Sequence, residues 1–253
     1  MPEPKDLIEK AERYLKQQQE MYGKFSVSLS NTDEKNDTVE QSDDIKRPGS
    51  PQSKAKRELT QDEKIAACQT LDELKSLCKN ADELKTDLQG TNLVFGVGDP
   101  KADLIVIGEA PGYNEDQQGE PFVGEAGQLL DKIMNAINFS RDEIYITNIL
   151  KHRPPNNRDP KQEERQRSLP YLLRQIELID PKLILCVGRI SATTLLGEDT
   201  SLSKLRGEFH SFHGRELMAT YHPAALLRNP KWKRHAWEDV QKLRKRYNEL
   251  GGK

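Results

Sequence analysis

Residues 104–112 have the sequence LIVIGEAPG, in which a short apolar run is followed directly by a carboxylate and a Pro-Gly turn. Three further apolar runs follow along the chain, and all four are rich in Ile, Val and Leu with little alternation. Strands that are buried on both faces have this pattern. The four predicted strands are Leu104–Gly108, Ile144–Ile149, Leu183–Gly188 and Glu216–Tyr221.

Segments with helical periodicity lie between these runs. One face of the first carries Leu129, Leu130, Ile133, Met134 and Ile137, and one face of the second carries Leu169, Leu172, Leu173, Ile176 and Ile179. A last helix is expected from Trp232 to Leu250. Strands that alternate with helices imply right-handed crossovers and a parallel sheet covered on both faces. We therefore predict an α/β fold of three layers, α/β/α, with a central four-stranded parallel sheet.

The N-terminal quarter of the chain has a different composition. Residues 1–22 have a helix-like pattern with one apolar face, whereas residues 23–57 consist of Ser, Asp, Lys and Gln with almost no apolar side chains. Such a segment cannot bury enough surface to offset its chain entropy, so we expect a disordered linker. Two capping boxes follow, Thr60 with Glu63 and Thr70 with Glu73. The globular domain is expected to span residues 58–253.

Charge and composition limit the possible classes of protein. The 253 residues carry a formal charge of −2 and are 34% hydrophobic, and they contain no apolar run long enough to cross a membrane. From the N-terminal residues given, which lack an apolar core, we expect no secretory signal. We expect a cytoplasmic protein. Residues 223–253 contain nine Lys or Arg but only three Asp or Glu. A basic face therefore coexists with an acidic stretch at residues 33–44.

Polar residues follow the predicted strands where a parallel sheet binds its ligands, beyond the carboxyl ends. Glu109 follows the first strand, Asn148 lies near the end of the second, and His222 follows the fourth. Each has another interpretation: Glu109 as a surface acid, Asn148 as a turn cap, and His222 as a turn residue before proline. The glycines at 108 and 112 serve the backbone in part. Together, these strand ends favour one crevice that holds a carboxylate, a carboxamide and an imidazole.

Three longer motifs carry a resemblance to a known family. They are GEAPGYNEDQQGEPFVGEAGQLLDKIM, YITNILKHRPPNNRDP and YHPAALLRNP. They resemble the signatures of the uracil-DNA glycosylase superfamily, and in particular its thermophile-type branch, family 4. The resemblance runs from about residue 71 to residue 237, in the family's order and spacing.

The resemblance implies roles for the strand-end residues. Phe122 would stack on a uracil that is flipped out of DNA, and Asn148 would hydrogen-bond the edge of that base. The backbone around Gly108, Glu109 and Ala110 would bind a further uracil oxygen. His222, as a neutral donor, would stabilise the negative charge that develops on the departing base.

The water that attacks the sugar needs another group. In the best-known glycosylase branch an aspartate does this from the position of Ala110, which alanine cannot. The resemblance leaves Glu109, Glu115 or Asn157 to hold the water or to stabilise the sugar cation, with Glu109 ranked first.

A loop after His222 would contact the DNA. The resemblance places an apolar wedge at Leu226 and Leu227, with phosphate contacts from Arg228, Lys231 and, on the opposite side, Arg158. An apolar loop packed on the body and a solvated helix start are the other interpretations.

Members of family 4 usually carry a [4Fe–4S] cluster on four cysteines. By resemblance the four positions are Cys78, Ala81, His152 and Ser168, of which one is a cysteine. We expect no cluster, no metal and no other cofactor, since a zinc ion on Cys78 and His152 would lack its remaining ligands.

The leading hypothesis is a monofunctional uracil-DNA glycosylase that acts on single- and double-stranded DNA, without a membrane partner. One alternative is a DNA-binding or scaffold protein of repair or replication that acts through a protein partner of the N-terminal helix. A second is an enzyme for another deaminated base, against which Asn148 argues, because its contacts suit a pyrimidine edge.

Overall fold

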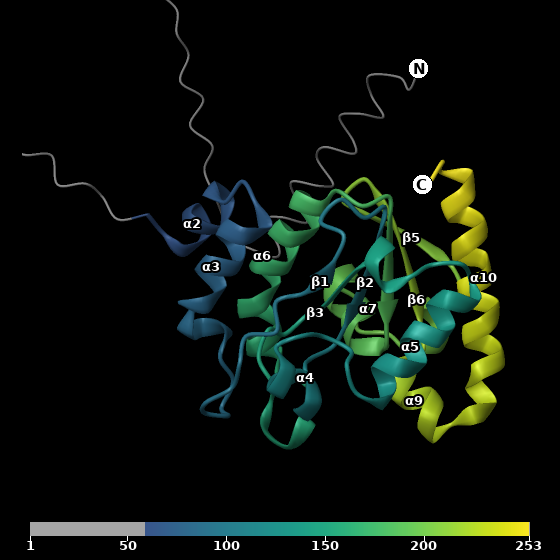
Figure 1. Ribbon diagram of the computed structural model, residues 1–253, viewed down its shortest axis with the longest axis horizontal. Helices are drawn as coiled ribbons and strands as arrows, with labels where there is room; N and C mark the ends of the chain where they lie inside the picture. The colour runs from purple at the N-terminus through teal and green to yellow at the C-terminus, as the bar shows by residue number, and fades with distance from the viewer. Residues whose placement is uncertain (1–58, 253) are drawn as a thin grey trace, which may run out of the picture. The chain divides into compact units, whose positions relative to one another are not determined.

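The computed structural model describes residues 59–252 (Figure 1). The helix expected at residues 1–22 and the linker expected at 23–57 lie outside the described residues. The strands are β1 (Val97–Gly98), β2 (Leu104–Gly108), β3 (Tyr145–Asn148), β4 (Leu183–Val187), β5 (Phe209–Phe212) and β6 (Arg215–Thr220). The helices are α2 (Gln61–Ala67), α3 (Leu71–Lys79), α4 (Tyr113–Gln118), α5 (Glu125–Ala136), α6 (Gln162–Ile179), α7 (Arg189–Leu196), α8 (Leu202–Leu205), α9 (Pro223–Arg228) and α10 (Lys233–Glu249). Among these helices, none has the length and apolar character that crossing a bilayer requires.

The strands form one mixed sheet in the order β1-β3-β2-β4-β6-β5. The four strands predicted from the sequence, β2, β3, β4 and β6, are parallel and occupy the centre. The α/β class is confirmed, but the sheet has two more strands than expected. Both lie at the edges and run antiparallel to their neighbours: β1 on β3, and β5 on β6.

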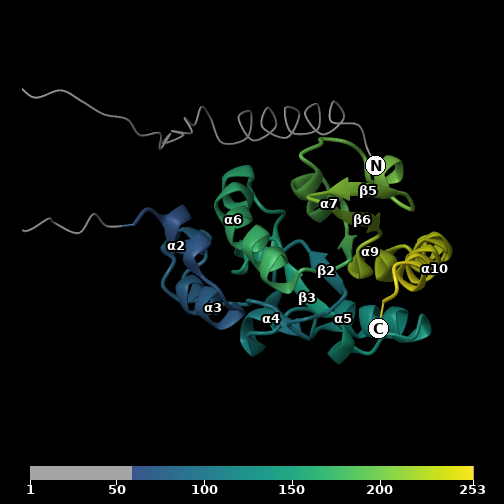
Figure 2. The same ribbon diagram turned by 90° about the horizontal axis from the view of Figure 1, so that it is seen from above.

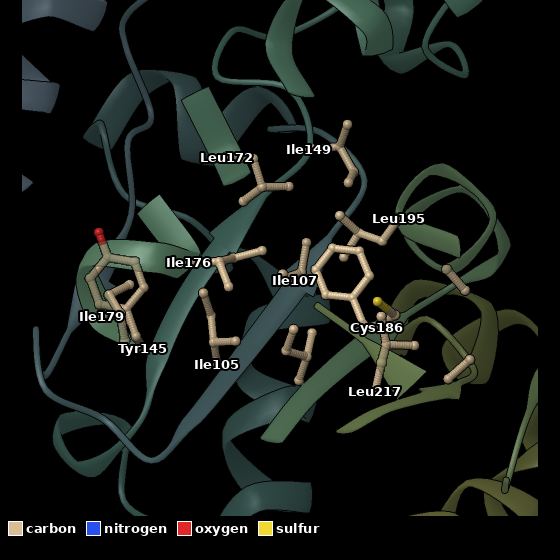
Figure 3. Packing of buried hydrophobic residues seen from close by; sticks show 14 of the residues in the cluster. Ile105, Ile107, Tyr145, Ile149, Leu172, Ile176, Ile179, Cys186, Leu195 and Leu217 are labelled. Carbon is tan, nitrogen blue, oxygen red and sulfur yellow. The ribbon is translucent and has the colours of Figure 1, made fainter. Parts of the chain in front are cut away.

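Helices cover both faces of the sheet. Helices α6 and α7 lie on one side and α5 and α10 on the other (Figure 2). Neighbouring residues of a strand point to opposite faces, so Ile105 and Ile107 pack beneath α6 and α7 (Figure 3), whereas Leu104 and Val106 pack against α5 and α10. The predicted helical faces therefore do meet the sheet.

Helices α2 and α3 pack on the outer side of α6 (Figure 2). The Tyr171 hydroxyl on α6 accepts a hydrogen bond from Gln61 and donates one to Glu83. The Thr60 capping box forms as predicted. The second box differs, because Thr70 caps α3 while Glu73 accepts from the N–H of Gln69, one residue earlier than expected.

Candidate active site

A cleft of about 580 Å³ opens at the carboxyl ends of β2, β3 and β6. Parallel sheets bind ligands at this edge, because the strand ends and the loops after them converge there. The cleft brings together nine of the candidate site residues that the sequence singled out. They are Glu109, Ala110, Glu115, Phe122, Asn148, Asn157, Arg158, His222 and Arg228.

Phe122 lines the cleft and lies close to Gly108 at the end of β2. The Phe122 ring stacks on the His222 ring, with 5.5 Å between centroids and 29° between planes. A Cβ at Gly108 would lie 2.5 Å from Cζ of Phe122 and 2.3 Å from Oδ1 of Asn148. Glycine is therefore required at the end of β2, because any side chain there would displace both neighbours.

The backbone at Phe122 is held in an uncommon conformation. Its φ is +55°, in the left-handed region, which costs free energy for a residue with a side chain. The Arg141 guanidinium donates to the carbonyls of Pro121 and Phe122, and it also pairs with Asp131 at 3.0 Å. Gly127 leaves room for the Phe122 carbonyl, since a Cβ there would lie 1.8 Å from that oxygen. These contacts fix the ring's direction.

Asn148 ends β3 with its side chain at the cleft and only 2% of its surface exposed. Behind it lies Lys151, which is fully buried. The Lys151 ammonium donates to the carbonyl of Asn148 at 3.0 Å, to Oγ1 of Thr147 at 2.7 Å and to Oε1 of Gln175 at 2.7 Å. Burial lowers the pKa of Lys151 to about 7. The strand end that carries Asn148 is thus tied to α6.

His222 caps the N-terminus of α9 through its ring. The Ala224 N–H donates to Nδ1 at 3.1 Å. Burial, followed by the positive charge of Arg228, lowers the pKa of His222 to about 4, while Glu115 opposes the shift. The imidazole is therefore neutral at ordinary pH. Because Nδ1 accepts a hydrogen bond, the proton of the neutral ring is on Nε2, which remains a donor.

Glu109 lies on the loop that follows β2. Burial, followed by the negative charge of Asp159, raises its pKa to about 7, against the opposing charges of Arg189 and Arg165. The two states of this carboxyl group are thus both populated near neutral pH. Its neighbour Ala110 lines the cleft with a methyl group and supplies no titratable atom.

Glu115 and Asn157, the other two candidate catalytic residues, have partners within the protein. One Glu115 carboxylate oxygen accepts from the N–H of Gly112 at 3.1 Å, and the other accepts from Val123 and Gly124 at 3.0 Å. Oδ1 of Asn157 accepts from Nε of Arg153 at 2.7 Å. Glu115 therefore joins the loop after β2 to the segment after Phe122, and Asn157 orients Arg153.

The structure separates the residues that were predicted to bind DNA. Leu227 is 42% exposed on α9, whereas Leu226, the other residue of the predicted wedge, is 1% exposed because α9 turns it into the protein. Lys231 is exposed and Arg228 lines the cleft. Arg158 forms two hydrogen bonds with the Glu164 carboxylate, at 2.7 and 2.8 Å, which holds its own loop.

The four positions that correspond to cluster ligands do not fit an iron–sulfur cluster. Burial raises the pKa of the Cys78 thiol to about 12, Ala81 has no ligand atom, and Oγ of Ser168 donates to the Ile149 carbonyl at 2.6 Å. Nδ1 of His152 lies 3.0 Å from the Thr91 hydroxyl. Within residues 59–252, no group of three or more His, Cys, Asp or Glu is placed to hold a metal ion.

Several residues of the site were not found from the sequence. Tyr113, Asn114 and Asp159 line the cleft. Asp239 on α10 accepts a hydrogen bond from the Thr220 hydroxyl at 2.7 Å, which fixes the end of β6 two residues before the imidazole. The position of Tyr113 directly after the Pro-Gly turn was the one available signal, whereas the partners of Asp239 come from folding.

Comparison with known proteins gives the family. A family model described as "Uracil DNA glycosylase superfamily" matches residues 95–241 of the chain. The chain is 43% identical over 171 residues to the Type-4 uracil-DNA glycosylase of Archaeoglobus fulgidus, covering 64% of this chain and 84% of that protein. It is 45% identical over 181 residues to the Type-4 uracil-DNA glycosylase of Sulfurisphaera tokodaii, covering 64% and 82%. A DNA polymerase of Bacillus phage SP01 is 32% identical over 149 residues, which cover 58% of this chain and 16% of the polymerase.

Proposed function

The chain belongs to the uracil-DNA glycosylase superfamily, and from that premise we propose that it hydrolyses the bond between uracil and deoxyribose in DNA, at the start of base excision repair. The observation that carries the proposal is the meeting of an aromatic ring, a carboxamide and a neutral imidazole in one cleft. A base inside a duplex is out of reach, so the enzyme takes it out of the stack into such a pocket.

Uracil recognition falls to Phe122 and Asn148. The flat face of Phe122 takes the ring of the base by stacking. The Asn148 carboxamide offers one acceptor and one donor, which match N3–H and O4 of uracil and mismatch the corresponding edge of cytosine. The Lys151 ammonium behind the strand end supports this discrimination, because it holds the Asn148 backbone in place.

His222 acts on the leaving group. As the glycosidic bond breaks, the electron pair of that bond goes to the base and negative charge develops on its O2. The Nε2–H of a neutral imidazole donates a hydrogen bond to this oxygen and stabilises the anion, in the manner of an oxyanion hole. The lowered pKa of His222 supports a neutral donor, and the N–H of Ala224 fixes the required tautomer.

Glu109 acts on the sugar side of the bond. In its ionised form the carboxylate stabilises the positive charge that develops on the deoxyribose and accepts a proton from the attacking water. A base is most useful when its pKa lies near the working pH, which is the case for a carboxyl group raised to about 7. The contacts of Glu115 and Asn157 favour a supporting role for both, in shaping the loops around this carboxylate.

Contacts to DNA are assigned to the surface beyond α9. Exposed Leu227 would fill the space that the flipped base leaves, and Arg228 and Lys231 would contact phosphates. We propose that uracil in both single- and double-stranded DNA is a substrate, since none of these contacts needs a pairing partner.

The test is release of uracil from a labelled oligonucleotide, with abasic sites cleaved by alkali. The wild-type chain is compared with His222→Ala. The control variant is His210→Ala, which removes a histidine on β5 whose Nε2 lies 2.9 Å from the carbonyl oxygen of Leu205. Strand breaks with the wild type and the His210 variant, and few with the His222 variant, support the proposal. Absence of breaks with wild type on either form of DNA refutes it.

A second candidate function is a DNA-binding protein of repair or replication that does not release the base. The similarity to a segment of a phage DNA polymerase favours it, since this segment is a small part of a protein named for replication. A protein partner would bind through residues 1–22, outside the described residues. The same oligonucleotides separate the two candidates, because this protein would bind uracil-containing DNA without producing alkali-sensitive sites.

A further inference from the structure

Tyr113 differs from the other exposed apolar side chains of residues 59–252. The large apolar side chains exposed in that range are Leu59, Tyr113, Phe209, Leu227, Trp232 and Trp237. Of these, Tyr113 alone lines the cleft, and it is 56% exposed. An aromatic ring at the rim of a base-binding cleft, more than half open to solvent, is placed to contact whatever part of the ligand remains outside.

The Tyr113 ring is held in place by its helix and by a neighbouring arginine. Tyr113 is the first residue of α4, whose N-terminus is fixed by Glu115 through the N–H of Gly112. The Arg153 guanidinium lies over the ring at 5.1 Å from its centroid. One face of the ring is thus covered by a cation, and the exposure of the side chain leaves the other face accessible.

Arg153 is itself anchored at both ends. Its backbone carbonyl accepts a hydrogen bond from the Thr86 hydroxyl at 2.6 Å, and its Nε donates to Asn157 at 2.7 Å. An anchored guanidinium keeps the aromatic ring in one orientation before the ligand arrives, which lowers the entropy lost on binding. We call Tyr113 and Arg153 the rim platform.

We propose that the rim platform is a stacking site for the base next to the flipped uracil. The proposal rests on the function proposed above, because it takes uracil-containing DNA as the ligand. Bases stack on aromatic side chains whatever their sequence. The guanidinium holds the opposite face of the ring by cation–π attraction, and its positive charge attracts the phosphate backbone.

The platform should matter most for single-stranded DNA. In a duplex the neighbouring base is already stacked and paired, so leaving the helix for Tyr113 has a cost. In a single strand the base has no pairing partner, and stacking on the protein orders the nucleotide beside the reacting one. The rim platform therefore favours uracil in single strands.

The first experiment compares uracil release by wild type, Tyr113→Ala and Tyr113→Phe on single- and double-stranded oligonucleotides, with Phe209→Ala on β5 as the matched control for an exposed aromatic outside the cleft. We expect Tyr113→Ala to raise KM on single-stranded DNA by roughly tenfold with little change in kcat, and to affect the duplex less. Tyr113→Phe, which keeps the ring, should retain the wild-type KM, and Phe209→Ala should leave both substrates unaffected.

A second experiment locates the stacked base. A fluorescent 2-aminopurine is placed on the 5′ or the 3′ side of a non-hydrolysable deoxyuridine analogue in a single strand. Stacking on Tyr113 quenches the probe on one side, and Tyr113→Ala abolishes that quenching. The inference is overturned if wild type releases uracil and Tyr113→Ala has an unchanged KM on single-stranded DNA. A wild type that releases no uracil overturns the proposed function instead.

Discussion

Replacing Glu109 with glutamine is expected to stabilise the fold while it weakens catalysis. In the unfolded chain this carboxyl group has its ordinary pKa of 4.5, and in the folded protein burial raises that pKa to about 7. The folded state thus holds a proton that the unfolded state has lost between these two values. The free energy of unfolding therefore falls as the pH rises from 4.5 to about 7. Above about pH 7 the full destabilisation by the buried carboxylate is present.

The magnitude follows from the size of the pKa difference. At about 1.4 kcal/mol for each pH unit, the rise from 4.5 to about 7 corresponds to about 3 kcal/mol. Solvent that enters the open cleft screens the carboxylate, so we expect a measured gain of about 2 kcal/mol for Glu109→Gln at about pH 8. Near pH 4 both side chains are neutral and nearly isosteric, and the two proteins should have equal stability.

Urea unfolding followed by circular dichroism at several pH values between about 4 and 8 measures this difference. Glu143→Gln is the control of opposite sign, because hydrogen bonds from the N–H and hydroxyl of Ser140 lower the pKa of Glu143. Uracil release is measured on the same samples, where Glu109→Gln should lose about a hundredfold or more in rate. A stability difference that does not change with pH, or a variant less stable than wild type at about pH 8, would refute the conclusion that burial raises the pKa of Glu109.

Three further results are expected. His222→Ala should lower the rate of uracil release by about a hundred- to a thousandfold, because it removes the donor to the leaving base, and it should lower the urea midpoint slightly, because the ring also caps α9; and since the pKa of His222 lies at about 4, the wild-type rate should show no step from this ring between about pH 7 and 5. Gly108→Ala should leave the circular dichroism spectrum intact but abolish most uracil release, since the added Cβ would lie 2.3 Å from Oδ1 of Asn148; a variant with full activity would contradict the tight base pocket. Lys151→Met should lower the free energy of unfolding by about 3 kcal/mol in urea titrations, because it leaves several buried oxygen acceptors without a donor, and a neutral effect would show that water replaces the ammonium.

The centre of the sheet could be predicted because its strands are defined by local composition. The five apolar or small residues of β2 are bounded by charged side chains on both sides, and the structure places the strand at the same residues. The edge strands could not be predicted in this way. β1 has two residues, too few for any pattern, and β5 has the sequence FHSF, with one buried residue of four. Both depend on pairing with a neighbour that is already in place.

The candidate site was predictable to the extent that topology determines it. Residues that follow parallel strands must converge, so the sequence was enough to bring Glu109, Asn148 and His222 to one cleft. It could not show which polar groups are already engaged. Glu115 is held by backbone N–H groups eight and nine residues away, and the burial of Leu226 depends on how α9 packs.

Helices α2 and α3 are held to the rest of the domain by apolar packing and hydrogen bonds. Near the loop after β3, Ser168 on α6 donates to the carbonyl of Ile149 and the Thr91 hydroxyl contacts His152. Helices α2 and α3 are bound to α6 by a buried apolar cluster and by Arg174, whose guanidinium donates twice to the carbonyl of Cys68. Each hydrogen bond contributes only about 1 kcal/mol, so the region depends on many small contacts acting together. Such contacts require neither iron nor ionised thiols, and burial raises the pKa of the Cys78 thiol to about 12.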